Sequence, residues 1–497
     1  MTRHGRLCWQ SIVAAVVVAV GFSGAQRASG QNFKVLAPSV NEGQAKALSG
    51  QVANALRNAA APDAAAQKQL DDFFKGYLYP LMTSTDPTQL GQLAERREQL
   101  FQRYLNAAKS QGARDYLNNL TLKQMGAFAV GPYHPAVRYN AALIMGQLDA
   151  QPGVKPLPTG TNGLLILLEG EEFNKVAVPT AVKVAALVGL QRHVRLGVDA
   201  PTGERITKAA LAVANREELP EDASAKAYGW VRRQAAKVLA AQFAKGLTPP
   251  VHDTFVRLVA DDKSDLDDRC AVAELLKPEM FSGAQGLDAE AMAQALGGLA
   301  RNVLAIEAKE AGDFLDEMIG GGIPAPGGFE GGRGGGGYGS EGGGYMGRGG
   351  GGYGGGYAGR GGEGGGVDFG ALGLEDQGPK YEKRRMIDRT LAIVAGAEAV
   401  AAGASDELKE RLAEFSTAIL QVAEASAPEN ATDAEITDWV VELEKDVNRL
   451  VSNWAPARPA ADEAVEAEDA EAAEAPEAPE AAPAEEAAAP VEAAGGN

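Results

Sequence analysis

The segment 320–366 constrains the fold more than any other part of this chain, because glycine makes up most of it, with scattered tyrosines and arginines. Glycine loses more backbone entropy on ordering than any other residue and has no side chain to bury, so such a segment does not pack as a domain. The sequence therefore predicts a disordered Gly-rich linker over residues 319–378. This linker divides a long helix-forming part from a shorter C-terminal part.

The composition on either side of the linker favours helices. Of the 497 residues 45% are hydrophobic, but only 6% are aromatic, and alanine supplies much of the rest. Alanine is the strongest helix former, whereas the aromatic and β-branched residues that strands prefer are sparse. We predict an all-α protein of more than one domain.

The N-terminus has the pattern of a secretory signal peptide, assigned to residues 1–30. Arg3 and Arg6 precede an apolar run at 12–22, and small residues between Ala25 and Gly30 offer a cleavage site. The run is too short for the roughly 20 residues that cross a bilayer. These features predict a secreted or periplasmic protein with no integral membrane segment after cleavage.

Cysteine usage agrees with this reading. Cleavage removes Cys8 and leaves Cys270, and one thiol does not close a disulfide within the chain. A reactive or intermolecular thiol is one interpretation of Cys270. A small buried core residue is the interpretation we prefer, because free cysteine is among the most buried residue types.

Residues 31–130 predict helical hairpins. Asp63 precedes apolar residues spaced by three and four, which form one face of a helix. Asp86 and Pro87 provide an N-cap and a proline for the first turn of the next helix. A third helix is expected over 113–130. The breaks between these helices are short, so they should pack against one another.

A helical motif recurs over roughly residues 131–280, within a predicted repeat domain of residues 131–318. Its first copy begins at His134-Pro135, continues with Val137-Arg138 and reaches Leu148 through small and aliphatic residues. A second clear copy covers 230–239, and weaker copies cover 179–190 and 266–276. They recur at intervals of roughly 40 residues, the period of HEAT and armadillo repeats. The motif resembles the helix of a HEAT repeat, in which small residues let the next helix approach.

The resemblance implies an irregular HEAT-like α-solenoid, in which each helix pair buries its apolar face against its neighbours. Two interpretations of its arginines remain open. They line a binding groove, or they tie one repeat to the next along their apolar stems. A third reading, for the arginines beside His193, is that they complement the negative end of a helix dipole. The candidate binding residues are Arg138, Arg192, Arg195, Arg232 and Arg233.

The chain lacks the common sequence signatures of enzymes. Its mature part contains three histidines, His134, His193 and His252, without an H-E-x-x-H or C-x-x-C motif. Neither a G-x-S-x-G elbow nor a P-loop occurs. We therefore expect no enzymatic activity, no catalytic residues, no cofactor and no metal site.

The arginines of the Gly-rich linker resemble RGG segments, in which arginine neutralises phosphate and aromatic rings stack on bases. Acidic residues within the linker balance them, and the formal charge of the chain is −19. A flexible linker is the interpretation we prefer, and a nucleic-acid partner is not expected. The arginines are Arg333, Arg348 and Arg360, and the acidic residues are Glu330, Glu341 and Glu363.

The C-terminal part reads as a small helical bundle, residues 379–455, followed by a disordered Ala/Glu/Pro tail, residues 456–497. Two heptad-like apolar seams resemble those of coiled coils, and Thr432 with Glu435 forms a capping box. We expect these seams to pack within the chain. The acidic composition of the tail is typical of disorder.

Three functions follow from these patterns. The first is a non-catalytic secreted or periplasmic helical-repeat scaffold that binds a protein or cell-envelope component. The second is a self-assembling structural protein that uses the Gly/Tyr/Arg linker and the C-terminal helices. The third is an RGG-like nucleic-acid binder. We prefer the first, while the partner and the oligomeric state stay open.

Overall fold

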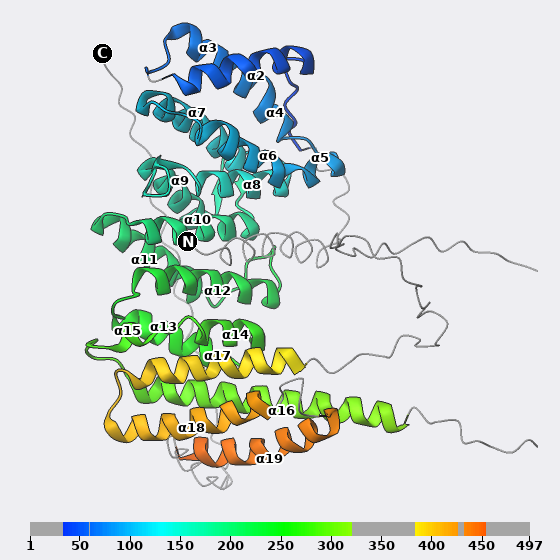
Figure 1. Ribbon diagram of the computed structural model, residues 1–497, viewed down its shortest axis with the longest axis vertical. Helices are drawn as coiled ribbons and strands as arrows, with labels where there is room; N and C mark the ends of the chain where they lie inside the picture. The colour runs from blue at the N-terminus through cyan, green and yellow to red at the C-terminus, as the bar shows by residue number, and fades with distance from the viewer. Residues whose placement is uncertain (1–32, 59, 321–382, 426–431, 454–497) are drawn as a thin grey trace, which may run out of the picture. The chain divides into compact units, whose positions relative to one another are not determined.

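A computed structural model describes residues 33–58, 60–320, 383–425 and 432–453, which form an all-α structure with two short β-hairpins (Figure 1). The hairpins pair β1 (Asp149–Gln151) with β2 (Lys155–Pro156), and β3 (Glu172–Phe173) with β4 (Val176–Ala177), both antiparallel. The predicted signal peptide, nearly all of the Gly-rich linker and the acidic tail lie outside the described residues.

Gly76 is the residue on which the segment before the first helix docks. Asp63 caps α3 by accepting a hydrogen bond from the amide of Ala66. A π-helical turn, η2, interrupts the helix after Phe73, and there the carbonyl of Gly76 accepts hydrogen bonds from the amides of Ser39 and Val40. A side chain on Gly76 would collide with those same residues, so glycine is required for this docking. The elements are α2 (Glu42–Arg57), α3 (Ala64–Phe73), η2 (Phe74–Leu78), α4 (Tyr79–Leu81), α5 (Pro87–Gly91), α6 (Leu93–Gln99) and η3 (Leu100–Leu105).

The following helices form antiparallel pairs that stack in two columns. Column A contains α7, α9, α11, α13, α16 and α19, and column B contains α8, α10, α12, α14, α17 and α18; each helix contacts its partner in the other column and its neighbours in its own. Their bounds are α7 (Gln111–Val130), α8 (Pro135–Met145), α9 (Pro158–Glu169), α10 (Thr180–Leu196), α11 (Ala200–Ala214), α12 (Ala225–Gln242), α13 (Pro249–Ala260), α14 (Leu266–Ala273), α15 (Pro278–Phe281), α16 (Ala289–Gly320), α17 (Lys383–Ala401), α18 (Asp406–Ala425) and α19 (Asp433–Ser452). All four predicted copies of the motif fall on column B.

Small residues allow helices of column B to approach closely. A Cβ atom built on Gly189 of α10 would lie 2.8 Å from the Cα of Gly146, the residue that ends α8. In the same way, a Cβ atom on Gly396 of α17 would lie 3.3 Å from the carbonyl oxygen of Ala273 in α14. Side chains cannot be added at such backbone contacts without moving the helices.

The three C-terminal helices share the core of the helices that precede the Gly-rich segment. The sequence-based division assigns residues 379–455 to a bundle of their own. In the structure α17 packs on α14 and α16, α18 packs on α17, and α19 packs on α18 and returns to α16. The predicted apolar seams, including Leu412, Phe415 and Val440, are buried within the chain. The capping box of Thr432 and Glu435 is present.

The C-terminal helices share this core because α16 and α17, which flank the Gly-rich segment, are the two antiparallel helices of one pair (Figure 1). The Gly-rich segment therefore connects the two helices of one pair. Each such pair, with one helix in each column, is called a layer below. The entropy of closing a loop grows only with the logarithm of its length, so a long insertion between packed helices is tolerated. The change in composition at the Gly-rich segment thus marks an insertion between two packed helices. It does not mark the border of a folded unit.

Shortening this connection should leave the helices in place and stabilise them. Deleting residues 329–374 reduces the connection between α16 and α17 to about a quarter of its length, and each halving contributes about 0.6 kcal/mol. We expect the free energy of unfolding to rise by about 1 kcal/mol. Urea unfolding followed by circular dichroism measures it, and a loss of cooperativity or of stability would contradict the shared core.

Candidate functional site

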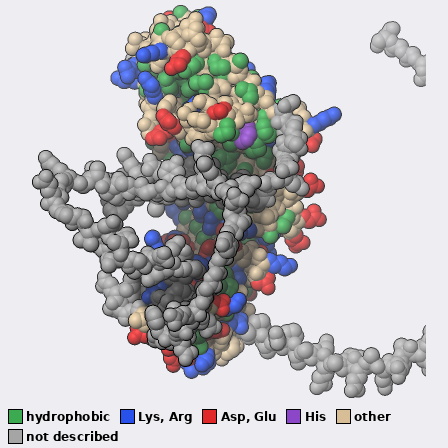
Figure 2. Space-filling model, turned by 90° about the vertical axis from the view of Figure 1, so that its right-hand side faces the viewer, with side chains coloured by type: hydrophobic (Ala, Val, Ile, Leu, Met, Phe, Trp, Pro, Cys, Tyr) green, Lys and Arg blue, Asp and Glu red, His purple; other side chains and the backbone are tan. Residues whose placement is uncertain are grey.

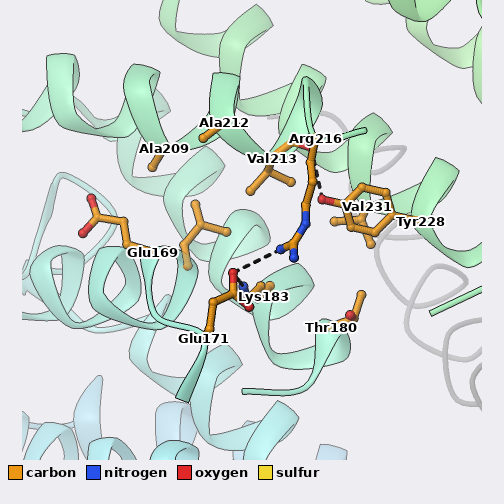
Figure 3. Close-up of a pocket in the computed structure, with 11 residues that line it drawn as sticks. Glu169, Glu171, Thr180, Lys183, Ala209, Ala212, Val213, Arg216, Tyr228 and Val231 are labelled. Carbon is orange, nitrogen blue, oxygen red and sulfur yellow. Dashed lines mark hydrogen bonds and ion pairs between the residues drawn. The ribbon is translucent and has the colours of Figure 1, made fainter. Parts of the chain in front are cut away.

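A cavity of about 120 Å³ lies between the layer of α9 and α10 and the layer of α11 and α12 (Figure 3). Its polar lining includes Glu171, which precedes β3, Lys183 in the first turns of α10, Arg216, which follows α11, and Tyr228 of α12. Glu169 at the end of α9 and Thr180 at the start of α10 also line it. Aliphatic side chains complete the wall. These are Leu168, Ala209, Ala212, Val213 and Val231.

Two cations share one carboxylate oxygen at this cavity. Lys183 Nζ donates to Glu171 Oε1 at 2.7 Å, and Arg216 Nη1 donates to the same oxygen at 3.1 Å. The Lys183 side chain is only 8% exposed, whereas the Glu171 side chain is 64% exposed. A buried ammonium is thus paired with a carboxylate that stands largely in solvent.

The electrostatics follow from this arrangement. Partial burial by itself favours the neutral acid, but the hydrogen bond and charge of Lys183, together with Arg216, lower the pKa of Glu171 below its ordinary value. Burial raises the pKa of the Tyr228 phenol. The phenol is therefore neutral, and its hydroxyl already donates a hydrogen bond to the carbonyl of Val213 at 3.2 Å.

The second acidic residue beside the cavity is likewise occupied. Glu169 accepts two hydrogen bonds from Arg205 of α11, at 2.9 Å and 2.6 Å. Nearby, Asp222 accepts from the backbone amide and the hydroxyl of Thr180 at the start of α10. Glu171 is therefore the carboxylate of the cavity wall that pairs with both Lys183 and Arg216.

The predicted binding residue Arg138 lies inside the fold. It is buried in α8, and its Nε donates at 2.9 Å to the carbonyl of Ala129 near the end of α7. Arg269 of α14 makes the same bond to Val259 of α13 at 2.8 Å. Each arginine caps the C-terminus of its partner helix, where a cation is electrostatically favoured.

Arg192 bridges two layers. Both of its terminal nitrogens donate to Asp149 of β1, at 2.7 Å and 2.6 Å, and Nη1 also approaches the carbonyl of Gly146 at 3.3 Å. A planar guanidinium suits such a bidentate contact. Arg192 therefore joins α10 to the end of α8.

Two further predicted residues, Arg232 and Arg233, join α12 to the next layer. Arg232 pairs with Asp261 at 3.2 Å, and Arg233 pairs with Asp268 at 3.0 Å. Arg195 is the exposed member of the predicted set. Burial and the charges of Arg233 and Arg195 lower the pKa of Lys237 in α12, whereas the charge of Glu274 raises it. The structure thus places Arg195, Arg233 and Lys237 together on column B and keeps Arg138 apart in the core.

Sequence reasoning missed the residues of the cavity, although one signal was available. Arg138 and Arg269 are each the fourth residue of their helix, and Lys183 has the same place in α10. A basic residue at one register of three column B helices is readable from the sequence once their starts are aligned. Glu171 and Arg216 come from connections of irregular length, so no periodic pattern points to them.

Thiol and metal chemistry find little support in the described part of the chain. Cys270 is buried, and burial raises the pKa of its thiol to about 12, which leaves the unreactive protonated form. Within residues 33–58, 60–320, 383–425 and 432–453, no three His, Cys, Asp or Glu side chains are grouped closely enough to bind a metal ion.

His193 makes stability depend on pH. It is buried, its Nδ1 lies 2.9 Å from the hydroxyl of Thr161, and burial, with the neighbouring charge of Arg192, lowers its pKa from 6.5 to about 4. Between pH 6.5 and 4 the imidazole of His193 is protonated in the unfolded chain and neutral in the folded chain. The free energy of unfolding therefore falls as the pH falls from 6.5 towards 4. The slope reaches about 1.4 kcal/mol per pH unit. Urea unfolding at several pH values should show this slope reduced in H193Q, and parallel curves would contradict it.

No helix among the described residues combines the length and the apolar character needed to cross a membrane. The chain was also compared with protein-family models, with curated proteins and with solved structures, and no family model, curated protein or solved structure matches it.

Proposed function

We propose that this chain is a non-catalytic, HEAT-like helical-repeat scaffold, secreted or periplasmic, that binds a protein or cell-envelope component through its repeat surface. The observation that carries the proposal is the uninterrupted stacking of helix pairs from α7 and α8 to α18 and α19. Stacks of this kind present a continuous surface to which each repeat contributes a few side chains.

Arginines that bridge successive layers support this proposal, because a binding surface needs a fixed spacing of its repeats. Each of these arginines contacts the layer before or after its own, through a carboxylate or a helix-end carbonyl. They are Arg192, Arg205, Arg232, Arg233, Arg257, Arg389 and Arg411. These contacts correspond to the interpretation in which the arginines tie one repeat to the next. Binding of a partner is then left to the exposed residues beside them.

The basic residues Arg195, which is exposed, and Arg233 and Lys237, which are half-buried, form the part of column B that we assign to partner contact. It joins adjacent helices, α10 and α12, and its charges are only partly balanced by Asp268 and Glu274. On the face drawn in Figure 2, acidic and basic side chains are mixed over the described surface. Mixed charge of this kind suits a protein surface better than a polyanion.

The self-assembly alternative invokes the Gly/Tyr/Arg linker and the C-terminal helices. The apolar seams of these helices are buried within the chain, where α18 packs on α17 and α19 packs on α16. The Gly/Tyr/Arg segment that it also invokes, and that the nucleic-acid alternative requires, lies outside the described residues.

Photo-cross-linking tests the binding surface. A cross-linking amino acid at Arg195 on column B is compared with one at the exposed Lys208 of α11 on column A, in the full chain exported to the cell envelope. We expect a discrete adduct from position 195 and little from position 208. Equal labelling, or no adduct from either position, would contradict the proposal.

Export is tested separately. N-terminal sequencing of the protein from the envelope or the medium should give a chain that starts between residues 26 and 31, because cleavage is expected between Ala25 and Gly30. An intact Met1 in every fraction would rule out the cleaved signal and the compartment that it implies.

A further inference from the structure

The charges around the cavity between α9 and α12 are not balanced by groups inside it. An ammonium has three donors, and among the described residues Lys183 Nζ has one side-chain acceptor, Glu171 Oε1. Arg216 uses the same oxygen. Two cations therefore share one carboxylate oxygen.

Lysine at this place is itself informative. In α8 and α14 the fourth residue is an arginine that reaches the last turn of the partner helix and caps a carbonyl. Lys183 in α10 extends to Glu171 instead and lines open space. The layer of α9 and α10 thus keeps the cation but directs it towards a cavity.

The size and walls of the cavity define what fits. A volume of about 120 Å³ is well below the roughly 300–1,000 Å³ of pockets for drug-sized ligands. It accommodates a carboxylate with a short carbon chain. The cations lie at one part of the wall, and Leu168, Val213 and Val231 provide apolar contact for the chain.

We propose that this cavity binds a carboxylate on a short aliphatic stem, which takes the place of Glu171 on Lys183 and Arg216. Glu171 precedes the short β3–β4 hairpin, and its side chain is already mostly exposed, so it returns to water without burying a charge. Glu171 acts as an internal competitor. The incoming group is a free short-chain carboxylate or the glutamate side chain of a protein.

Titration calorimetry on the full chain tests this with two probes, propionate and the peptide N-acetyl-Ala-Glu-Ala-amide. We expect saturable binding to the native chain. Binding should tighten about tenfold in E171Q, where the competing charge is gone, and weaken at least tenfold in K183M. The fold should survive K183M, because methionine suits a buried position and the abandoned Glu171 is exposed.

Two surface variants serve as controls: E172Q changes the exposed neighbour of Glu171, and K208M removes an exposed cation of α11. Both should bind like the native chain. Binding of propionate alone identifies a free carboxylate as the ligand, and binding of the peptide as well identifies a protein side chain. The proposal fails if neither probe binds native chain or E171Q, if the corresponding glutamine peptide binds equally well, or if K183M binds undiminished.

Discussion

Replacing Arg389 by methionine should destabilise the protein by about 3–5 kcal/mol, because it removes the cation nearest to a carboxylate that lies in the core. Glu307 of α16 is 0% exposed, and Arg389 Nη1 of α17 donates to its Oε1 at 2.6 Å. Arg389 also pairs with Asp267 of α14 at 2.8 Å. Arg385 approaches Glu307 less closely, at 3.4 Å, and compensates only in part. Urea unfolding of R389M measures the loss.

Two further variants identify the cause. R384M removes an exposed arginine of the same helix and should leave stability unchanged. The double variant E307L/R389M removes both charges, and it should recover most of the loss, since an apolar pair of similar volume replaces a buried ion pair at little cost. If R389M is as stable as R384M, the pair does not hold α17 to α16.

An alanine at position 189 should destabilise the protein by about 2–3 kcal/mol, and a valine by more. The new Cβ atom would lie 2.8 Å from the Cα of Gly146 and 2.7 Å from Cδ1 of Leu164. The first of these is backbone, which cannot rotate away, so α8 and α10 must separate. Thermal and urea unfolding of G189A and G189V measure the effect.

The matched control variant, G126A, should change the stability in the opposite direction. Gly126 lies within α7, and nothing lies within 4 Å of a Cβ atom built there. Alanine at that position should stabilise the protein by about 0.5–1 kcal/mol, because it has a better helix propensity and no collision. If G189A behaves like G126A, the close approach of the two helices is wrong.

Local sequence signals predicted local structure well. Asp86 and Thr432 each cap the helix that follows, as Pro87 after the first and Glu435 after the second indicate. The all-α class followed from composition and apolar spacing. These signals act within one or two helical turns, and neighbouring residues are sufficient to produce them.

Partnership between helices was harder to predict. The C-terminal helices were assigned to a separate bundle, because the glycines before them mark a sharp change in composition. The sequence of residues 383–401 contains no signal that the apolar face of this helix packs on α14 and α16. That match depends on the shape of surfaces far apart in the chain, and it becomes visible only when the pairs are assembled.

The candidate site was unpredictable for a similar reason. The arginines that stood out in the repeat motif are largely engaged in contacts between helices. The cavity instead depends on Lys183 meeting Glu171 and Arg216, and the last two lie in connections whose geometry their own sequence does not determine. A register comparison of the column B helices would have found Lys183 alone.

The pairing of α16 with α17 also decides how the protein carries a mechanical load. Because residues 320 and 383 belong to helices of one pair, and α19 also packs on α16, a pulling force between residues 33 and 453 acts first on contacts between packed helices. The connection between residues 320 and 383 bears that force only after α16 separates from α17 and α19. The Arg389–Glu307 contact opposes this separation.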